Sequence, residues 1–166
     1  MLLLDQNRAL WDRMLIGRGQ AALARAEKLA GDVPGPYVLQ AAIAACHARA
    51  PAAEETDWPK IASLYTELTR LVPSPVIQLN RAVAVGMASG PAGALDIVDS
   101  LRAEPSLAGY HLLPSVRGDL LFKLGRFEEA RAEFERAATL TRNARERKLL
   151  TERAAACVRE AAPAKT

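Results

Sequence analysis

The sequence predicts an all-α protein in which helical hairpins stack into a short right-handed solenoid. Alanine supplies 33 of the 166 residues and aromatic residues only 5%, a composition that favours closely packed helices over sheets. Turn residues interrupt the chain at short intervals, and between them the apolar residues recur at helical spacing. Patterns of small and large residues also recur about every 34 residues, which indicates a helical repeat.

About nine helices joined by tight turns are expected. Ser74-Pro75 and Gly90-Pro91 each place a capping residue before a proline, which suits the first helical turn because proline lacks an N–H. The ranges expected to be helical are 5–16, 19–30, 36–50, 57–72, 74–88, 91–103, 109–124, 127–141 and 144–161.

Other helix ends follow from glycine and from capping residues. Gly31 and Gly125 can adopt the left-handed conformation that ends a helix. Asn143 and Glu146 have the spacing of a capping box, in which each side chain bonds the other residue's backbone. These residues set the remaining joints between the helices.

The last repeat has the signature spacing of the tetratricopeptide repeat (TPR), a pair of antiparallel helices. Equivalent positions recur at Ile61, Ala94 and Ala130, which are 33 and 36 residues apart. The small side chains are expected where the two helices of a hairpin pack closely or turn, and larger ones there would separate the helices. The structural repeat positions are Ala82, Ala94, Gly118, Gly125, Ala130 and Ala137.

The repeats are expected to form one domain over residues 1–162, with residues 163–166 as a disordered tail. The end of a solenoid needs a cap, because no further repeat covers its outer apolar face. Leu149, Leu150, Ala154 and Cys157 provide such an apolar face on the last predicted helix. We therefore expect helix 144–161 to cap the array.

Charge and cysteine usage exclude several functional classes. The 22 basic and 19 acidic residues give a net charge of +3, too small to predict direct DNA binding. Cys46 and Cys157 lack the spacing of a metal or redox motif and are expected to be reduced thiols of a cytoplasmic protein. The first residues lack the apolar segment of a signal peptide, so no membrane association is expected.

No pattern indicates catalysis, a metal or a cofactor. The sequence lacks phosphate-binding loops, a nucleophile elbow and a zinc-protease motif. It contains two histidines, His47 and His111. His47 has no positioned carboxylate in the sequence and is expected to be packed or half-exposed, and Trp11 and Trp58 are expected to pack within hairpins. We therefore expect a protein that is not an enzyme and needs no cofactor.

Two groups of residues are candidates for partner binding. On the helices expected to line the concave side, amides such as Gln40 and Asn80 either hold a partner's backbone or bridge repeats as buried structure. On the terminal helix, basic residues either form a solvated face or dock an acidic partner. The groove candidates are Gln40, Asn80, Arg81, Ser115, Asp119, Phe122 and Lys123, and the terminal-helix candidates are Arg145, Arg147 and Arg153.

Five ordered blocks resemble the C-terminal TPR extension of a group of bacterial extracytoplasmic-function (ECF) sigma factors. They are residues 5–13 (DQNRALWDR), 40–48 (QAAIAACHA), 56–58 (TDW), 73–76 (PSPV) with 79–84 (LNRAVA), and 118–121 (GDLL) with 124–126 (LGR). The resemblance spans nearly the whole chain, while the promoter-reading sigma domains of that family are absent from it.

The resemblance implies a regulatory domain that modulates transcription initiation. Its partner would be its own sigma domains, core RNA polymerase or another regulator. Two alternatives follow from the residues: a stand-alone TPR adaptor that binds a peptide, and a small-molecule sensor lined near His47 or Tyr65. A carboxylate-binding adaptor would need several lysines, whereas the predicted groove of the last repeat supplies only Lys123 opposite Asp119.

Overall fold

The computed structural model describes residues 6–31 and 33–161, and all regular elements in these ranges are helical. The prediction of an all-α fold is confirmed. The start of the first predicted helix and the predicted tail lie outside the described residues. The α-helices are α1 (Arg13–Ala30), α2 (Pro36–Arg49), α3 (Trp58–Leu71), α4 (Pro75–Ser89), α5 (Pro91–Ser100), α6 (Leu112–Lys123), α7 (Phe127–Leu140) and α8 (Ala144–Ala161).

The prediction of two helices before residue 31 is wrong, because α1 is continuous. Asp12 begins it by accepting hydrogen bonds from the N–H groups of Met14 and Leu15, both at 2.9 Å, so the N-terminal cap lies inside the predicted first helix. A short 3-10 helix at Arg8–Leu10 precedes it. From α2 onward, the ends of the α-helices differ from the predicted ends by at most three residues.

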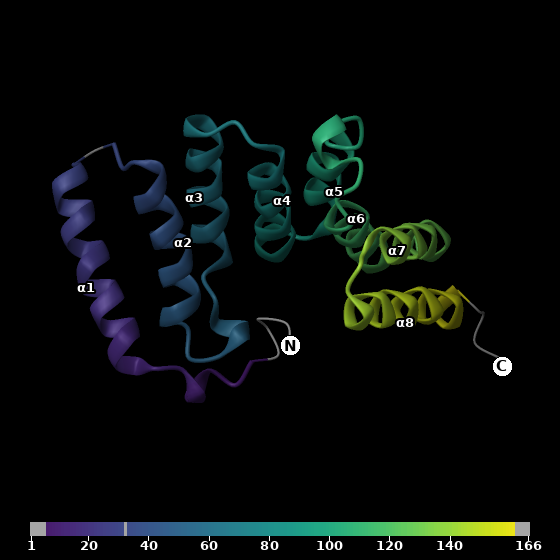
Figure 1. Cartoon of the computed structure of the whole chain (residues 1–166), viewed down its shortest axis with the longest axis horizontal. Helices are drawn as coiled ribbons and strands as arrows, with labels where there is room; N and C mark the ends of the chain where they lie inside the picture. Colours follow the sequence, from purple (N-terminus) through teal and green to yellow (C-terminus); the bar gives the residue numbers. More distant parts are fainter. Residues whose placement is uncertain (1–5, 32, 162–166) are drawn as a thin grey trace. The chain divides into compact units, whose positions relative to one another are not determined.

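The chain divides into two compact units, residues 1–77 and 78–166, with the boundary inside α4. In the first unit α1 packs on α2 and α2 on α3 (Figure 1). A small core of Leu23, Ala42 and Ala45 joins α1 to α2, with Val38 and Leu64 against it. This unit therefore contains one helical hairpin, α2 and α3, preceded by the helix α1.

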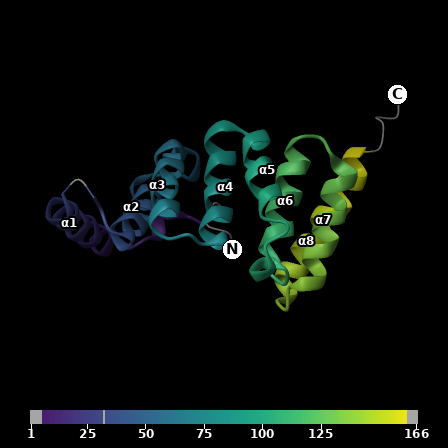
Figure 2. The same cartoon turned by 90° about the horizontal axis from the view of Figure 1, so that it is seen from above.

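The second unit holds the larger core. Its helices α5, α6, α7 and α8 pack consecutively, each on the next (Figure 2). Phe134 and Leu121 belong to this core, together with Leu79 and Ala82 of α4. Among the repeat positions, Ala82, Ala94, Ala130 and Ala137 are completely buried.

Gly118 lies where α6 passes closest to the ring of Phe134 on α7. A Cβ atom added at Gly118 would approach two ring carbons of Phe134 to 2.9 Å, closer than carbon atoms pack without displacement. The hairpin formed by α6 and α7 therefore depends on the absence of a side chain at this position.

The turn after α6 is a Schellman motif. Gly125 has a φ of 73°, which glycine adopts without strain. Its N–H donates to the carbonyl of Phe122, and the N–H of Arg126 donates to that of Leu121, both at 3.0 Å. These bonds satisfy two carbonyls at the helix end and direct the chain into α7.

Only half of the predicted capping box forms before α8. The side chain of Asn143 accepts from the N–H groups of Arg145 and Glu146, but Glu146 does not return the bond. Instead the hydroxyl of Thr141 donates to Glu146 Oε2 at 2.7 Å and accepts from the N–H of Asn143 at 3.2 Å. The neighbouring hydroxyl thus replaces the second half of the box.

The inner face of α8 differs in one position from the expected one. Leu150, Ala154 and Cys157 are buried and belong to the core of the second unit. Leu149 is 39% exposed, so its inclusion in the buried face is wrong. The helix contacts α7 through residues spaced three and four apart, and the position beside Leu150 points outward.

Substitution of Gly118 will test the close approach of α6 to α7. Gly118→Leu is expected to lower the free energy of unfolding by about 1–3 kcal/mol, because the added side chain must displace Phe134. Gly93→Ala is the control, since a Cβ at this exposed helical glycine meets no atom within 4 Å. It should be neutral or stabilising in urea unfolding followed by circular dichroism. Equal stability of the Gly118 variant and the wild type would contradict the close contact.

Candidate functional site

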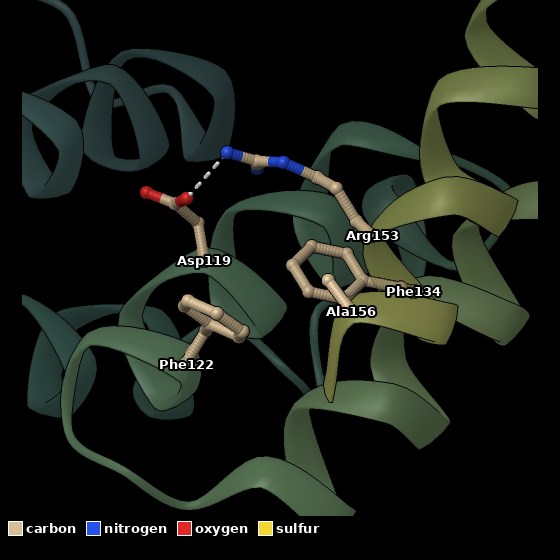
Figure 3. Close-up of a pocket in the computed structure, with 5 residues that line it drawn as sticks. All are labelled: Asp119, Phe122, Phe134, Arg153 and Ala156. Carbon is tan, nitrogen blue, oxygen red and sulfur yellow. Dashed lines mark ion pairs between the residues drawn. The ribbon is translucent and has the colours of Figure 1, made fainter. Parts of the chain in front are cut away.

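A pocket of about 130 Å³ opens on the second unit (Figure 3). Helix α6 supplies Asp119 and Phe122, which lie three residues apart and therefore face the same side of the helix. Helix α7 supplies Phe134, and α8 supplies Arg153 and Ala156. Three consecutive helices of the array thus build one site.

An ion pair between Asp119 and Arg153 lies at the rim of the pocket. Asp119 Oδ1 lies 2.9 Å from a terminal guanidinium nitrogen of Arg153, and its Oδ2 lies 2.9 Å from Nζ of Lys123. All three side chains are partly exposed. One carboxylate of the pocket lining is therefore shared by two cations, Arg153 of the lining and Lys123 beside it.

The floor of the pocket is apolar and aromatic. Phe134 is buried, and the guanidinium carbon of Arg153 lies 5.4 Å from the centre of its ring, within the range of a cation–π contact. Phe122 packs edge-on against Phe127, with ring centres 5.3 Å apart. The site can thus accept an apolar group next to a negatively charged one.

The structure unites residues from both predicted groups. Asp119 and Phe122 line the pocket, and Lys123 pairs with Asp119. Arg153, predicted separately as part of the terminal helix, forms the opposite side of the rim. Ser115 lies one turn before Asp119 on α6 and is not part of the lining.

The other groove candidates are not part of this lining. Gln40 is an exposed residue of α2 in the first unit. Asn80 is exposed on α4, and Arg81 donates a 3.2 Å hydrogen bond to Gln78 Oε1 on the same helix. The role of these residues in partner binding stays a prediction.

The first residues of α8 also lie outside the pocket lining. Arg145 is exposed in the first turn. A guanidinium nitrogen of Arg147 donates to the carbonyl of Thr141 at 2.9 Å, which ties α8 to the end of α7. Arg147 therefore contributes to the turn, whereas Arg153 contributes to the pocket.

Sequence reasoning missed a buried charge network in the second unit. Arg117 of α6 is buried and donates to Asp99 Oδ1 at 2.7 Å and to Glu133 Oε1 at 2.9 Å. Burial acts to lower the pKa of Arg117, but the hydrogen bonds and charges of these two carboxylates outweigh it and raise the pKa. This network joins α5, α6 and α7.

A second buried arginine organises the first unit. Arg8 donates to the carbonyls of His47, Ala50 and Ala52 and to the hydroxyl of Thr56, all within 3.0–3.1 Å. It thereby satisfies carbonyls at the end of α2 and in the loop that follows, as cations do at helix C-termini.

One tryptophan packs on this arginine and the other packs on its neighbour His47. The guanidinium carbon of Arg8 lies 5.2 Å from the ring centre of Trp11, and His47 contacts Trp58 edge-on at 5.3 Å. Burial lowers the pKa of His47, and the charge of Arg8 lowers it further, which favours a neutral imidazole. The residues around His47 thus form a packed cluster.

Within residues 6–31 and 33–161, no three His, Cys, Asp or Glu side chains come together in a way that could hold a metal ion. No helix in these ranges has the length and apolar character needed to cross a bilayer.

Comparison with solved structures identifies the class of fold. The chain resembles the NMR structure of the first TPR domain of the human RPAP3 protein, with a TM-score of 0.59 and 23% sequence identity. The similarity covers 75% of this chain and 95% of that domain. The prediction of a TPR-type helical solenoid is therefore confirmed.

Sequence comparison gives a relative of greater length. An uncharacterised protein of Rhizobium meliloti is 49% identical over 146 residues, which cover 88% of this chain. The same match covers 34% of the relative, so the chain spans about a third of its length. No model of a known protein family matches the chain.

Proposed function

We propose that this chain is a protein-interaction domain and that the pocket formed by α6, α7 and α8 receives a segment of the partner. The observation that carries the proposal is the pocket's combination of an aromatic floor with the partly exposed guanidinium of Arg153, whose carboxylate partner Asp119 is shared with Lys123. TPR-type arrays offer the extended surfaces of stacked hairpins to their partners. A pocket built from three successive helices is suited to this use.

The pocket chemistry defines the partner segment. An apolar side chain would enter between Phe122 and Ala156, and burial of such a group contributes about 1.5–3 kcal/mol. An adjacent carboxylate would bind Arg153, whose present partner Asp119 is shared with Lys123. A peptide bearing an acidic residue beside a large apolar one fits these contacts.

The biological context of the proposal is regulation of transcription initiation. The five sequence blocks that resemble the TPR extension of ECF sigma factors support it. The match to a third of a longer relative is compatible with a domain of a larger polypeptide. Its partner would then be the sigma domains of the same protein, core RNA polymerase or a separate regulator.

The reading frame around Met1 tests this context directly. We expect the gene to encode, in frame and upstream of Met1, the two promoter-reading domains of a sigma factor. A frame that lacks them would overturn the sigma-factor assignment and leave the general proposal of a protein-interaction domain in place.

Variants of the rim and floor test the pocket. Arg153→Glu is expected to weaken binding of the purified sigma domains at least about tenfold, because a partner carboxylate would meet a negative charge. Ala156→Leu should weaken it similarly by filling the cavity. Lys148→Glu makes the same charge change at an exposed position of α8 outside this pocket and should bind normally.

Isothermal titration calorimetry measures these affinities, and circular dichroism checks the fold. Unchanged binding by both pocket variants would place the interface elsewhere. Lack of binding by the wild type would instead exclude the sigma domains as the partner.

A further inference from the structure

The most exposed large hydrophobic residues of the described chain lie near its N-terminal end. Six large hydrophobic residues are each at least 59% exposed, and all lie between positions 10 and 37. No other large hydrophobic residue in the described ranges exceeds 50%. They are Leu10, Met14, Leu15, Leu29, Val33 and Tyr37. Two of them, Leu15 and Leu29, lie on the same face of α1.

Helix α1 organises part of this exposure into one face. Its inner side packs on α2, and its one buried residue is Leu23. On the opposite side, residues spaced three or four apart form a continuous exposed row, as helical geometry requires of one face. We call this row the α1 stripe: Leu15, Arg18, Ala22, Arg25 and Leu29.

The α1 stripe has a repeat of seven residues. Leu15, Ala22 and Leu29 are seven apart, and so are Arg18 and Arg25. Seven residues of helix span about 10.5 Å, so apolar contacts and arginines alternate along one side of α1, with Arg18 and Arg25 each three residues after an apolar position. The stripe is therefore shaped to receive another helix along its length.

The charge of α1 defines the helix that fits. The helix contains four basic residues and the single acidic residue Glu27. In a second copy of this chain, Arg18 and Arg25 would lie opposite arginines in either orientation of the paired stripes. Like charges in direct opposition disfavour that pairing, whereas carboxylates seven residues apart would complement the arginines.

We propose that the α1 stripe docks an acidic amphipathic helix of a partner protein, with leucine-type residues and carboxylates each repeating every seven residues. The apolar residues pack against Leu15, Ala22 and Leu29, and the carboxylates pair with Arg18 and Arg25. This surface lies in the first unit and is independent of the pocket proposed above in the second.

A designed peptide tests the proposal on the intact chain. The probe is a fluorescein-labelled helix of about 21 residues, with leucine and glutamate each repeated every seven residues on one face. The control peptide carries lysine in place of those glutamates. Fluorescence anisotropy should show binding of the acidic peptide only.

Charge reversal supplies the matched variants. Arg18→Glu with Arg25→Glu should weaken binding of the acidic peptide at least about tenfold and permit binding of the lysine peptide. Lys60→Glu with Arg70→Glu changes the same charge at exposed residues of α3 and should bind the acidic peptide normally. The pocket variant Arg153→Glu should also bind it normally.

Several outcomes would overturn the proposal. One is that the wild-type chain does not bind the acidic peptide. Another is that the α1 and α3 variants lose the same affinity for this peptide, which would indicate general charge attraction. A concentration-dependent dimer in sedimentation, abolished by the α1 variant, would instead assign the stripe to a second copy. Binding to phosphatidylserine vesicles in place of the peptide would assign it to an anionic membrane surface.

Discussion

Arg117→Ala is expected to lower the free energy of unfolding by about 3–5 kcal/mol, because it leaves Glu133 buried without its partner. The guanidinium of Arg117 lies 2.9 Å from Glu133 and 2.7 Å from Asp99, and both Arg117 and Glu133 are buried. Asp99 is half-exposed and can regain water. The cost therefore comes mainly from Glu133.

A second substitution separates the charge from the packing. Arg117→Met with Glu133→Gln removes both buried charges while keeping similar volumes, and it should recover part of the lost stability. Arg126→Ala is the matched control, because Arg126 forms an exposed ion pair with Glu129, and its removal should leave the free energy of unfolding nearly unchanged.

Urea unfolding followed by circular dichroism measures these differences. A loss below about 1 kcal/mol for Arg117→Ala would show that Glu133 gains water without cost. Such a small loss would contradict the network as a determinant of stability in the second unit.

Arg8→Ala is expected to destabilise the first unit by about 2–4 kcal/mol, because one buried side chain donates to three carbonyls and one hydroxyl. Arg8→Lys should recover only part of this loss, since an ammonium cannot reproduce the planar, forked geometry of a guanidinium. Arg25→Ala removes an exposed arginine of α1 and should be nearly neutral.

Tryptophan fluorescence reports this change locally. Both tryptophans of the chain, Trp11 and Trp58, lie in the first unit and pack around the Arg8 cluster. The fluorescence transition of Arg8→Ala should move to lower urea concentration than that of Arg25→Ala. Coincident transitions would show that the carbonyl contacts of Arg8 do not stabilise this unit.

The helical ranges from α2 onward follow largely from local signals. Pro91 begins α5 and Gly125 ends α6 as the sequence predicts, because proline and glycine restrict or free the backbone whatever surrounds them. Before residue 31 the local signals compete. Asp12 begins α1 inside the predicted first helix, and Gly17 and Gly19 continue it, since helical glycines cost little where other bonds and contacts support the helix.

The candidate site could be predicted only in part. The spacing of Asp119, Phe122 and Lys123 places them on one face of a single helix, which periodicity reveals. Their meeting with Arg153 of α8 depends on the packing of α6, α7 and α8. Residues 34 positions apart can approach only when the repeats are stacked, and no local pattern encodes that distance.

The sequence alone determined the all-helical class, the hairpin repeat and the positions that demand small side chains. These features arise from backbone preferences and from a periodicity contained within each helix. The tertiary structure decided which charged residues are buried. Arg8 and Arg117 look like ordinary surface arginines in the sequence, yet each lies inside its unit. Burial of a charge is favourable only when distant residues supply several acceptors at once, and only the folded chain brings those acceptors together.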